Sequence, residues 1–152
     1  MTGISQILQS LAALRPIFHS EADFQHTLAW ELQKRYPEAS LRLEYPIETL
    51  DAIMCLDILF ALPTKAFAIE LKYKTRRLAC TANNEQFYLR NHGAQDIGRY
   101  EVIKDIQRLE TMQRVRPNTK GCLIFLTNDS SYWTEGGLAR STKPFDYMKD
   151  MC

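Results

Sequence analysis

Apolar residues at helical spacing predict two helices in the first 37 residues of the chain. In the segment Met1–Arg15 they recur every three or four residues, as on one face of a short amphipathic helix. Its start lacks the basic residues of a signal peptide, so we expect a helix there. The second helix begins after Ser20, which can cap it together with Asp23, and Pro37 ends it. Its apolar face comprises Phe24, Leu28, Leu32 and Tyr36.

Alternating apolar and polar residues predict three strands after this helix. The first strand, Ser40–Glu48, is expected to be half-buried, and Pro46 favours a place near the edge of a sheet. The other two, Leu56–Leu62 and Ala66–Lys74, flank a turn at Pro63-Thr64 and form an antiparallel hairpin. Their apolar faces must meet on the same side of the sheet, because a shift of one residue would turn one face into solvent.

A two-residue turn fixes the register of this hairpin. It pairs Leu62 with Lys65, Phe60 with Phe67 and Ile58 with Ile69. The apolar face of the first strand is then formed by Leu56, Ile58, Phe60 and Leu62. The same register places Asp57 opposite Glu70 on the other face, with Lys72 two residues further along the second strand.

The rest of the chain predicts one more helix and one more strand. Thr75–Gly93 is polar and is expected to hold at most one short strand. Ala94–Val115 has helical periodicity, and Pro117 ends the helix. Its apolar stripe is expected to comprise Val102, Ile103, Ile106, Leu109 and Met112. Lys120–Thr127 is an apolar run that suits a buried, central strand, and no firm structure is assigned to residues 128–152.

This order of elements predicts an α/β (α+β) fold in which helices flank a mixed sheet. After the short leading helix the order is α-β-β-β-α-β. The sequence shows no internal repeat and no low-complexity block. We therefore expect residues 1–152 to form a single domain, with a core at about 20–127 and a C-terminal extension at 128–152.

Composition and charge exclude several classes of protein. The 152 residues are 45% hydrophobic and 24% charged, which is typical of a globular chain. With 19 basic and 18 acidic residues the net charge is +1, which excludes a strongly basic coat for nucleic acid but leaves room for a local basic patch. No apolar run is long enough to span a membrane. The four cysteines lie far apart without a C-x-x-C pair, which argues against zinc and predicts a cytoplasmic protein.

Asp57, Glu70 and Lys72 are the candidate chemical site. Two carboxylates brought together repel unless a cation lies between them or one of them is protonated. A hard divalent cation such as Mg²⁺ suits carboxylate, carbonyl and water ligands. An adjacent lysine can hold a water or a phosphate oxygen beside the cation. These groups together predict metal-assisted hydrolysis of a phosphodiester.

The chain resembles the PD-(D/E)XK nuclease superfamily at these residues. The resemblance consists of Asp57, twelve intervening residues and then Glu70-Leu71-Lys72. Leu56 stands where the motif has its proline. The order of elements over about residues 20–127 is similar to that of the superfamily's restriction-endonuclease-like fold. The resemblance therefore implies this fold and a nuclease activity.

The resemblance also implies a role for each matching residue. Asp57 and Glu70 would bind Mg²⁺ or Mn²⁺ together with the carbonyl of Leu71, and Lys72 would position or activate the attacking water. Glu21 stands where many members have a further catalytic acid on the first helix. Gln95 and Tyr100 are candidates for an accessory pair on the helix after the motif, one residue further apart than usual.

The expected substrate is nucleic acid, DNA rather than RNA, and a homodimer is a possible assembly. Three basic residues directly after the motif are expected to contact phosphate: Lys74, Arg76 and Arg77. The alternative is an ion-pair ladder across two strands, in a non-catalytic nucleic-acid-binding or protein-interaction module on the same fold. Glu44 is interpreted as a solvated side chain and Arg108 as an ordinary exposed charge, and the sequence offers no argument for a role of Asp105.

Overall fold

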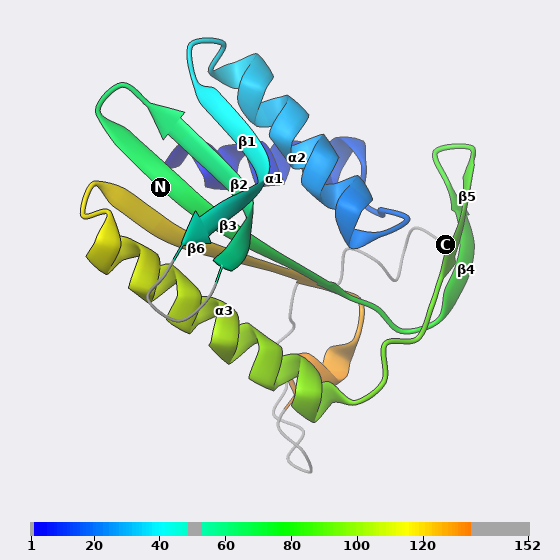
Figure 1. The fold of residues 1–152 in the computed structure, drawn as a ribbon. Coiled ribbons are helices and arrows are strands. Elements are labelled where there is room, and N and C mark those ends of the chain that lie inside the picture. The colour runs from blue at the N-terminus through cyan, green and yellow to red at the C-terminus, as the bar shows by residue number, and fades with distance from the viewer. Residues whose placement is uncertain (1, 49–52, 135–152) are drawn as a thin grey trace.

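A computed structural model describes residues 2–48 and 53–134, which form a mixed α/β structure with three α-helices (Figure 1). The helices are α1 (Thr2–Leu14), α2 (Glu21–Arg35) and α3 (Gln95–Val115), with a short 3₁₀ turn at Ser130–Tyr132. The strands are β1 (Ser40–Glu48), β2 (Ile53–Leu62), β3 (Lys65–Lys74), β4 (Leu78–Ala82), β5 (Glu85–Leu89) and β6 (Thr119–Thr127). The expected C-terminal extension lies outside the described residues from position 135 onward.

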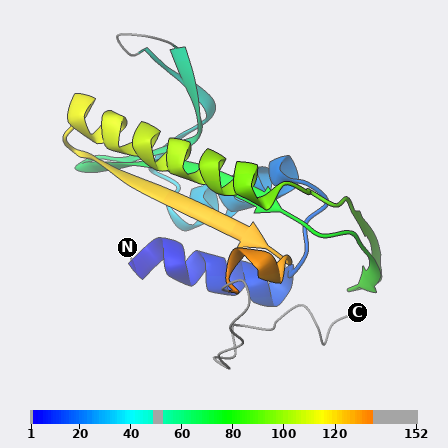
Figure 2. The ribbon, with the colours of Figure 1, turned by 90° about the horizontal axis from the view of Figure 1, so that it is seen from below.

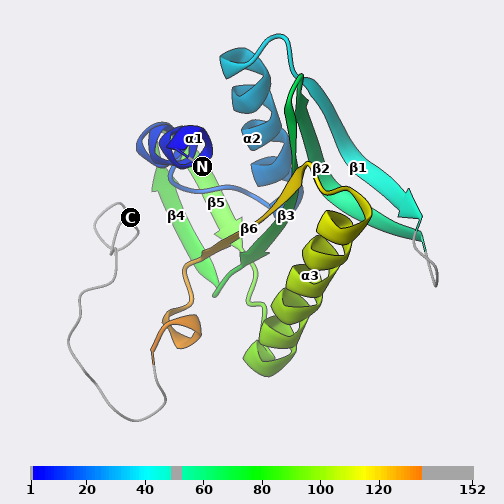
Figure 3. The ribbon, with the colours of Figure 1, turned by 90° about the vertical axis from the view of Figure 1, so that its left-hand side faces the viewer.

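The main sheet is mixed, as the sequence predicts, and has the strand order β1-β2-β3-β6. The pairs β1–β2 and β2–β3 are antiparallel, and β6 pairs with β3 in parallel. Helices α1 and α2 cover one face of this sheet and α3 covers the other (Figure 3). A separate apolar core therefore lies on each side of the sheet.

The register of the β2–β3 hairpin confirms the prediction. Leu62 pairs with Lys65, Phe60 with Phe67, and Ile58 with Ile69. Strand β1 lies at an edge of the sheet, as Pro46 indicates. Ser20 caps α2 by accepting a hydrogen bond from the backbone N–H of Asp23 at 3.1 Å.

The prediction that residues 120–127 form a central strand is wrong. Strand β6 is the last strand in the order of the sheet, and the hairpin strand β3 lies between β2 and β6. The run of apolar residues has another cause, because helices pack on both faces of β6 (Figure 2). Gly121 lets α3 approach closely, since a Cβ there would lie 2.9 Å from the Cβ of Leu109.

The predicted apolar stripe of α3 is correct in its C-terminal half and wrong in its middle. Leu109 and Met112 are buried against the sheet, but Ile103 and Ile106 are 53% and 42% exposed. The position that faces inward one turn before Leu109 belongs to Asp105, which is 3% exposed. The helix is therefore rotated so that polar groups face the sheet near its middle.

The polar segment after β3 contains two strands, where the sequence predicted at most one. Strands β4 and β5 form an antiparallel hairpin whose turn residues Asn83 and Asn84 have φ of 50° and 63°. Asparagine tolerates this left-handed backbone, so the Asn-Asn pair is the sequence signal for the turn. Phe87 and Leu89 of β5 are buried in the core that includes α1 and α2.

Within the described residues, no helix combines the length and the apolar character needed to cross a membrane.

Candidate functional site

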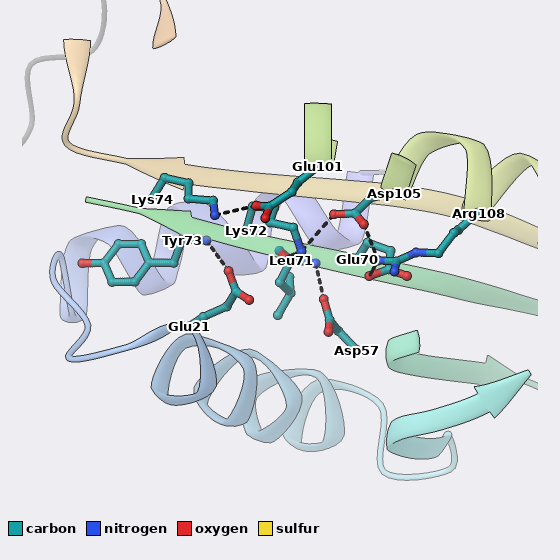
Figure 4. Close-up of polar contacts among 10 residues, drawn as sticks. All are labelled: Glu21, Asp57, Glu70, Leu71, Lys72, Tyr73, Lys74, Glu101, Asp105 and Arg108. Carbon is teal, nitrogen blue, oxygen red and sulfur yellow. Dashed lines mark hydrogen bonds and ion pairs between the residues drawn. The ribbon is translucent and has the colours of Figure 1, made fainter. Parts of the chain in front are cut away.

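The site lies where β2 leaves β3. The pairing of these strands ends at Ile58 and Ile69, although β3 continues to Lys74. Two backbone N–H groups further along β3 bond to carboxylates instead of a strand (Figure 4). The N–H of Leu71 donates to Asp57 Oδ2 at 2.6 Å, and the N–H of Tyr73 donates to Glu21 Oε2 at 2.6 Å.

An irregularity of β1 and β2 produces this separation. Their ladder pairs Leu43 with Ile58 and Tyr45 with Leu56, and it omits Glu44 and Asp57 between them. The φ of Glu44 is 48°, an unfavourable backbone conformation for a residue with a Cβ.

The interruption also reverses the side on which β2 buries its side chains. Ile58 packs in the core that includes α1 and α2, whereas Leu56 packs in the core that includes α3. The prediction that Leu56 shares a face with Ile58 is therefore wrong. The physical reason is the interruption of the β1–β2 pairing at Asp57.

Gln25 of α2 holds the irregular segment in place. Its Nε2 donates to Glu44 Oε1 at 2.7 Å and to the backbone carbonyl of Asp57 at 2.8 Å. Gln25 is buried, so these hydrogen bonds are shielded from water. Glu44 is exposed but is not merely solvated, because it accepts this bond and its charge contributes to raising the pKa of Asp57.

The structure brings Asp57 and Glu70 together. Their carboxyl groups are close enough to influence each other's pKa, and Glu70 is 2% exposed. Burial and the neighbouring Asp57 charge raise the pKa of Glu70 to about 8. Burial also raises the pKa of Asp57, against the bond from the Leu71 N–H. Two acids in this arrangement favour either a shared proton or a bound cation.

Lys72 lies beside these acids. Its Nζ donates to the carbonyl oxygen of Leu71 at 3.2 Å and lies 2.9 Å from Asp105 Oδ2. Burial lowers the pKa of Lys72, but the hydrogen bond and the charge of Asp105 outweigh it and raise the pKa. The lysine is therefore a protonated donor beside the carboxyl pair.

Asp105 and Arg108 of α3 complete the site, and the sequence interpretation missed both. Arg108 Nη2 donates to Glu70 Oε2 at 3.1 Å and also bonds to Asp105 (Figure 4). Arg108 is therefore not an ordinary exposed charge. Spacing permits the place of Asp105, because it precedes the buried Leu109 and Met112 by four and seven residues and shares their helical face, but spacing alone does not select it over Ile106.

The three basic residues after the motif have different surroundings. Lys74 Nζ lies 2.6 Å from Glu101 Oε2, and Arg76 Nε lies 2.9 Å from Asp129 Oδ1. Arg77 is exposed and forms no ion pair within the described part of the chain. The charges of Lys74 and Arg76 are thus partly neutralised by α3 and by the segment after β6.

The accessory pair proposed from the resemblance does not reach the carboxyl groups. Gln95 Nε2 donates to Asp129 Oδ2 at 3.1 Å, beyond the end of β6. Tyr100 is 61% exposed, and Lys104 Nζ lies 5.7 Å from the centre of its ring. Both residues lie on α3, but neither contacts Asp57, Glu70 or Lys72.

A polar pocket of about 380 Å³ lies between β3 and α3. Its walls are Glu21 of α2, Lys72 and Lys74 of β3, and four charged residues of α3, namely Glu101, Lys104, Asp105 and Arg108. The pocket therefore offers both cations and carboxylates at the place where Lys72 emerges from β3.

The donor set fits a hard divalent cation only with help from backbone and water. Among residues 2–48 and 53–134, no three His, Cys, Asp or Glu side chains gather in a metal-binding cluster. Asp57 and Glu70 provide two carboxylates, and the Leu71 carbonyl lies next to them on β3. Two carboxylates with a carbonyl and several waters is an ordinary environment for Mg²⁺, which keeps much of its hydration.

Comparisons with protein-family models, with curated proteins and with solved structures find no match to this chain.

Proposed function

We propose that this protein is a metal-dependent phosphodiester hydrolase of the PD-(D/E)XK type, acting on DNA or RNA, with a restriction-endonuclease-like core. The order α2, β1, β2, β3, α3 and β6 supports this fold, as does the parallel pairing of β6 with β3. The observation that carries the proposal is the meeting of the Asp57 and Glu70 carboxyl groups beside Lys72.

Asp57 and Glu70 would hold Mg²⁺ or Mn²⁺ together with the carbonyl oxygen of Leu71. Such a cation acidifies water and offsets the negative charge that develops on a phosphate under attack. The N–H of Leu71 fixes the Asp57 carboxylate, so this ligand is oriented before any cation binds. Burial keeps competing water away from Glu70 and strengthens its attraction for a cation.

Lys72 and Glu21 would act on the substrate side of this centre. The Lys72 ammonium has donor capacity beyond its contacts with Leu71 and Asp105, so it can hold a water or a phosphate oxygen. One carboxylate oxygen of Glu21 accepts a hydrogen bond from the N–H of Tyr73, and Glu21 lines the same pocket as Lys72. It is therefore placed to orient a water in that pocket.

A cleavage assay tests the proposal. The protein is incubated with plasmid, linear duplex and single-stranded DNA, and with RNA, in Mg²⁺, in Mn²⁺ and in excess chelator. We expect cleavage only with a divalent cation, and a loss of about a hundredfold or more in Lys72→Ala and Asp57→Asn. Glu110→Gln, an exposed carboxylate on α3, is the matched control and should cleave like the unmodified protein. Equal cleavage by Lys72→Ala would refute the proposed role of this site.

The second candidate is a non-catalytic module on the same fold. It is favoured by the contacts of Arg108 with Glu70 and of Lys72 with the Leu71 carbonyl, which already supply internal cations to the proposed ligands. In that case the protein binds nucleic acid without cutting it, and Mn²⁺ changes neither its melting temperature nor its affinity for DNA.

A further inference from the structure

Arg108 makes an incomplete ion pair with Glu70. A single Nη2 contact of 3.1 Å joins them, in place of the two parallel hydrogen bonds that a guanidinium and a carboxylate form at their best. The Nε of Arg108 is buried and has no hydrogen-bond partner among the described residues. The contact is thus loose on the Glu70 side.

The same Nη2 atom of Arg108 is also held by a residue of α3 itself. Asp105 lies one turn earlier, accepts from Arg108 Nη2 and is 3% exposed. The same carboxylate pairs with Lys72 at 2.9 Å. Asp105 therefore stays between two cations, and Arg108 can leave Glu70 without becoming an unpaired charge.

We infer that Arg108 is a built-in counter-cation that positions Glu70 in the cation-free protein and competes with a divalent cation for this carboxylate. The inference rests on the proposed function and goes beyond the motif, which contains no residue of α3. Once Glu70 has lost its proton, its buried carboxylate next to Asp57 needs a positive partner, and Arg108 supplies it. A second cation at Glu70 would meet the repulsion of the guanidinium, so Arg108 must turn toward Asp105 when that cation binds.

Mn²⁺ binding, measured as free Mn²⁺ by electron paramagnetic resonance, tests this competition. Arg108→Gln removes the guanidinium charge, and we expect it to tighten Mn²⁺ binding about tenfold. Arg108→Lys keeps a positive charge and should stay close to the unmodified affinity. Arg114→Gln, at an exposed arginine in the last turn of α3, is the matched control and should change nothing. A purely structural arginine would give weaker binding on removal.

The outcomes separate this inference from the proposed function. If Asp57→Asn abolishes Mn²⁺ binding but Arg108→Gln leaves the affinity equal or weaker, the competition is refuted and the proposed metal site stands. If neither the unmodified protein nor Arg108→Gln binds Mn²⁺, both are refuted. Binding by Arg108→Gln alone supports the competition in its strongest form.

A second measurement avoids the risk that Arg108→Gln fails to fold. In the unmodified protein, the ¹⁵N–¹H resonance of Arg108 Nε is followed while Mg²⁺ is added. We expect it to shift with the same midpoint as the amide of Leu71, because the guanidinium turns away as the carboxyl pair takes up the cation. An Nε resonance that stays fixed while the Leu71 amide shifts overturns the inference.

Discussion

Glu70 is the residue on which the electrostatics of this protein concentrate. Its carboxyl group is buried beside Asp57, and these surroundings raise its pKa to about 8. Arg108 reduces the repulsion between the two carboxylates through its contact with Glu70. The N–H of Leu71 reduces it through its hydrogen bond to Asp57. A carboxyl pair that stays partly protonated near neutral pH adds little to the stability of the fold, because its two charges repel. The same pair is a suitable set of ligands for a cation.

The stability of the cation-free protein is expected to fall as the pH rises from about 5 to about 8.5. In the folded state Glu70 keeps a proton up to about pH 8, whereas in the unfolded chain it loses the proton near its ordinary pKa of 4.5. The unfolded state therefore binds fewer protons in this range, and each unit of pKa difference corresponds to about 1.4 kcal/mol. The raised pKa of Asp57 acts in the same direction.

Thermal unfolding in chelator at several pH values between these limits is the measurement. Glu70→Gln has no proton to lose and should remove most of the decrease, while Glu110→Gln should retain it. Added Mn²⁺ should restore the melting temperature at the alkaline end, because it replaces the proton. A melting temperature that is flat or rises with pH in the unmodified protein contradicts the burial and coupling of this pair.

At the scale of elements, strand β3 and helix α3 together determine the site. Strand β3 presents Glu70 and Lys72, and the departure of β2 leaves its Leu71 N–H for Asp57. Asp105 of α3 faces the same strand, whereas the next residue, Ile106, is exposed to solvent. The rotation of α3 about its axis is thus set by ion pairs as well as by apolar packing.

The start of α3 carries a backbone strain that a substitution can relieve. Ala94 precedes the helix with φ of 60° and provides no side-chain cap. A left-handed conformation costs an alanine about 1–2 kcal/mol, and glycine avoids this at a smaller entropic cost in the unfolded chain. We therefore expect Ala94→Gly to raise the free energy of unfolding by about 0.5 kcal/mol in chemical denaturation.

Ala12→Gly provides the matched control for that substitution. Ala12 is an exposed residue inside α1, where glycine costs about 1 kcal/mol relative to alanine. The two substitutions should therefore change stability in opposite directions. A loss of stability in Ala94→Gly would show that the left-handed conformation at this position is wrong.

The sequence predicts an element correctly where one periodic pattern of apolar residues is enough to place it. The register of β2 and β3 from Ile58 and Ile69 to the turn follows from apolar alternation and a two-residue turn. The bond of Asp57 to the Leu71 N–H does not follow from it, because β2 leaves β3 at that point. The middle of α3 could not be predicted in this way, because Ile103 and Ile106 satisfy the helical repeat as well as Asp105 does. Only the charges on β3 decide between these two faces.

At the scale of the whole molecule, one polar network connects the layers on both sides of the sheet. Glu21 reaches it from α2, Asp57 from β2, and Asp105 and Arg108 from α3 (Figure 4). Gln25 of α2 joins it through the backbone carbonyl of Asp57. The net charge of +1 leaves little long-range attraction for nucleic acid. Under the proposed function, nucleic-acid binding would therefore depend on a few local cations that lack an acidic partner.

Arg77 is expected to contribute more to nucleic-acid binding than Lys74, although both follow the motif. Lys74 is paired with Glu101, whereas Arg77 is exposed without an acidic partner in the described chain. Arg77→Ala should reduce the slope of log affinity against log salt concentration by about 1. Filter binding or fluorescence anisotropy at several salt concentrations measures this slope. Arg114→Ala, at an exposed arginine in the last turn of α3, is the control. An equal effect of this substitution would contradict a local contact of Arg77 with nucleic acid.

The convergence of Asp57 and Glu70 on one divalent cation is the central claim, and paramagnetic broadening by Mn²⁺ tests it most directly. Substoichiometric Mn²⁺ is added to ¹⁵N-labelled protein, and the loss of each amide signal is recorded. We predict that the amides of Leu71 and Tyr73 disappear first, and that Glu70→Gln keeps them while Glu110→Gln does not. Broadening that is absent, centred elsewhere in the chain, or unchanged in Glu70→Gln contradicts the claim.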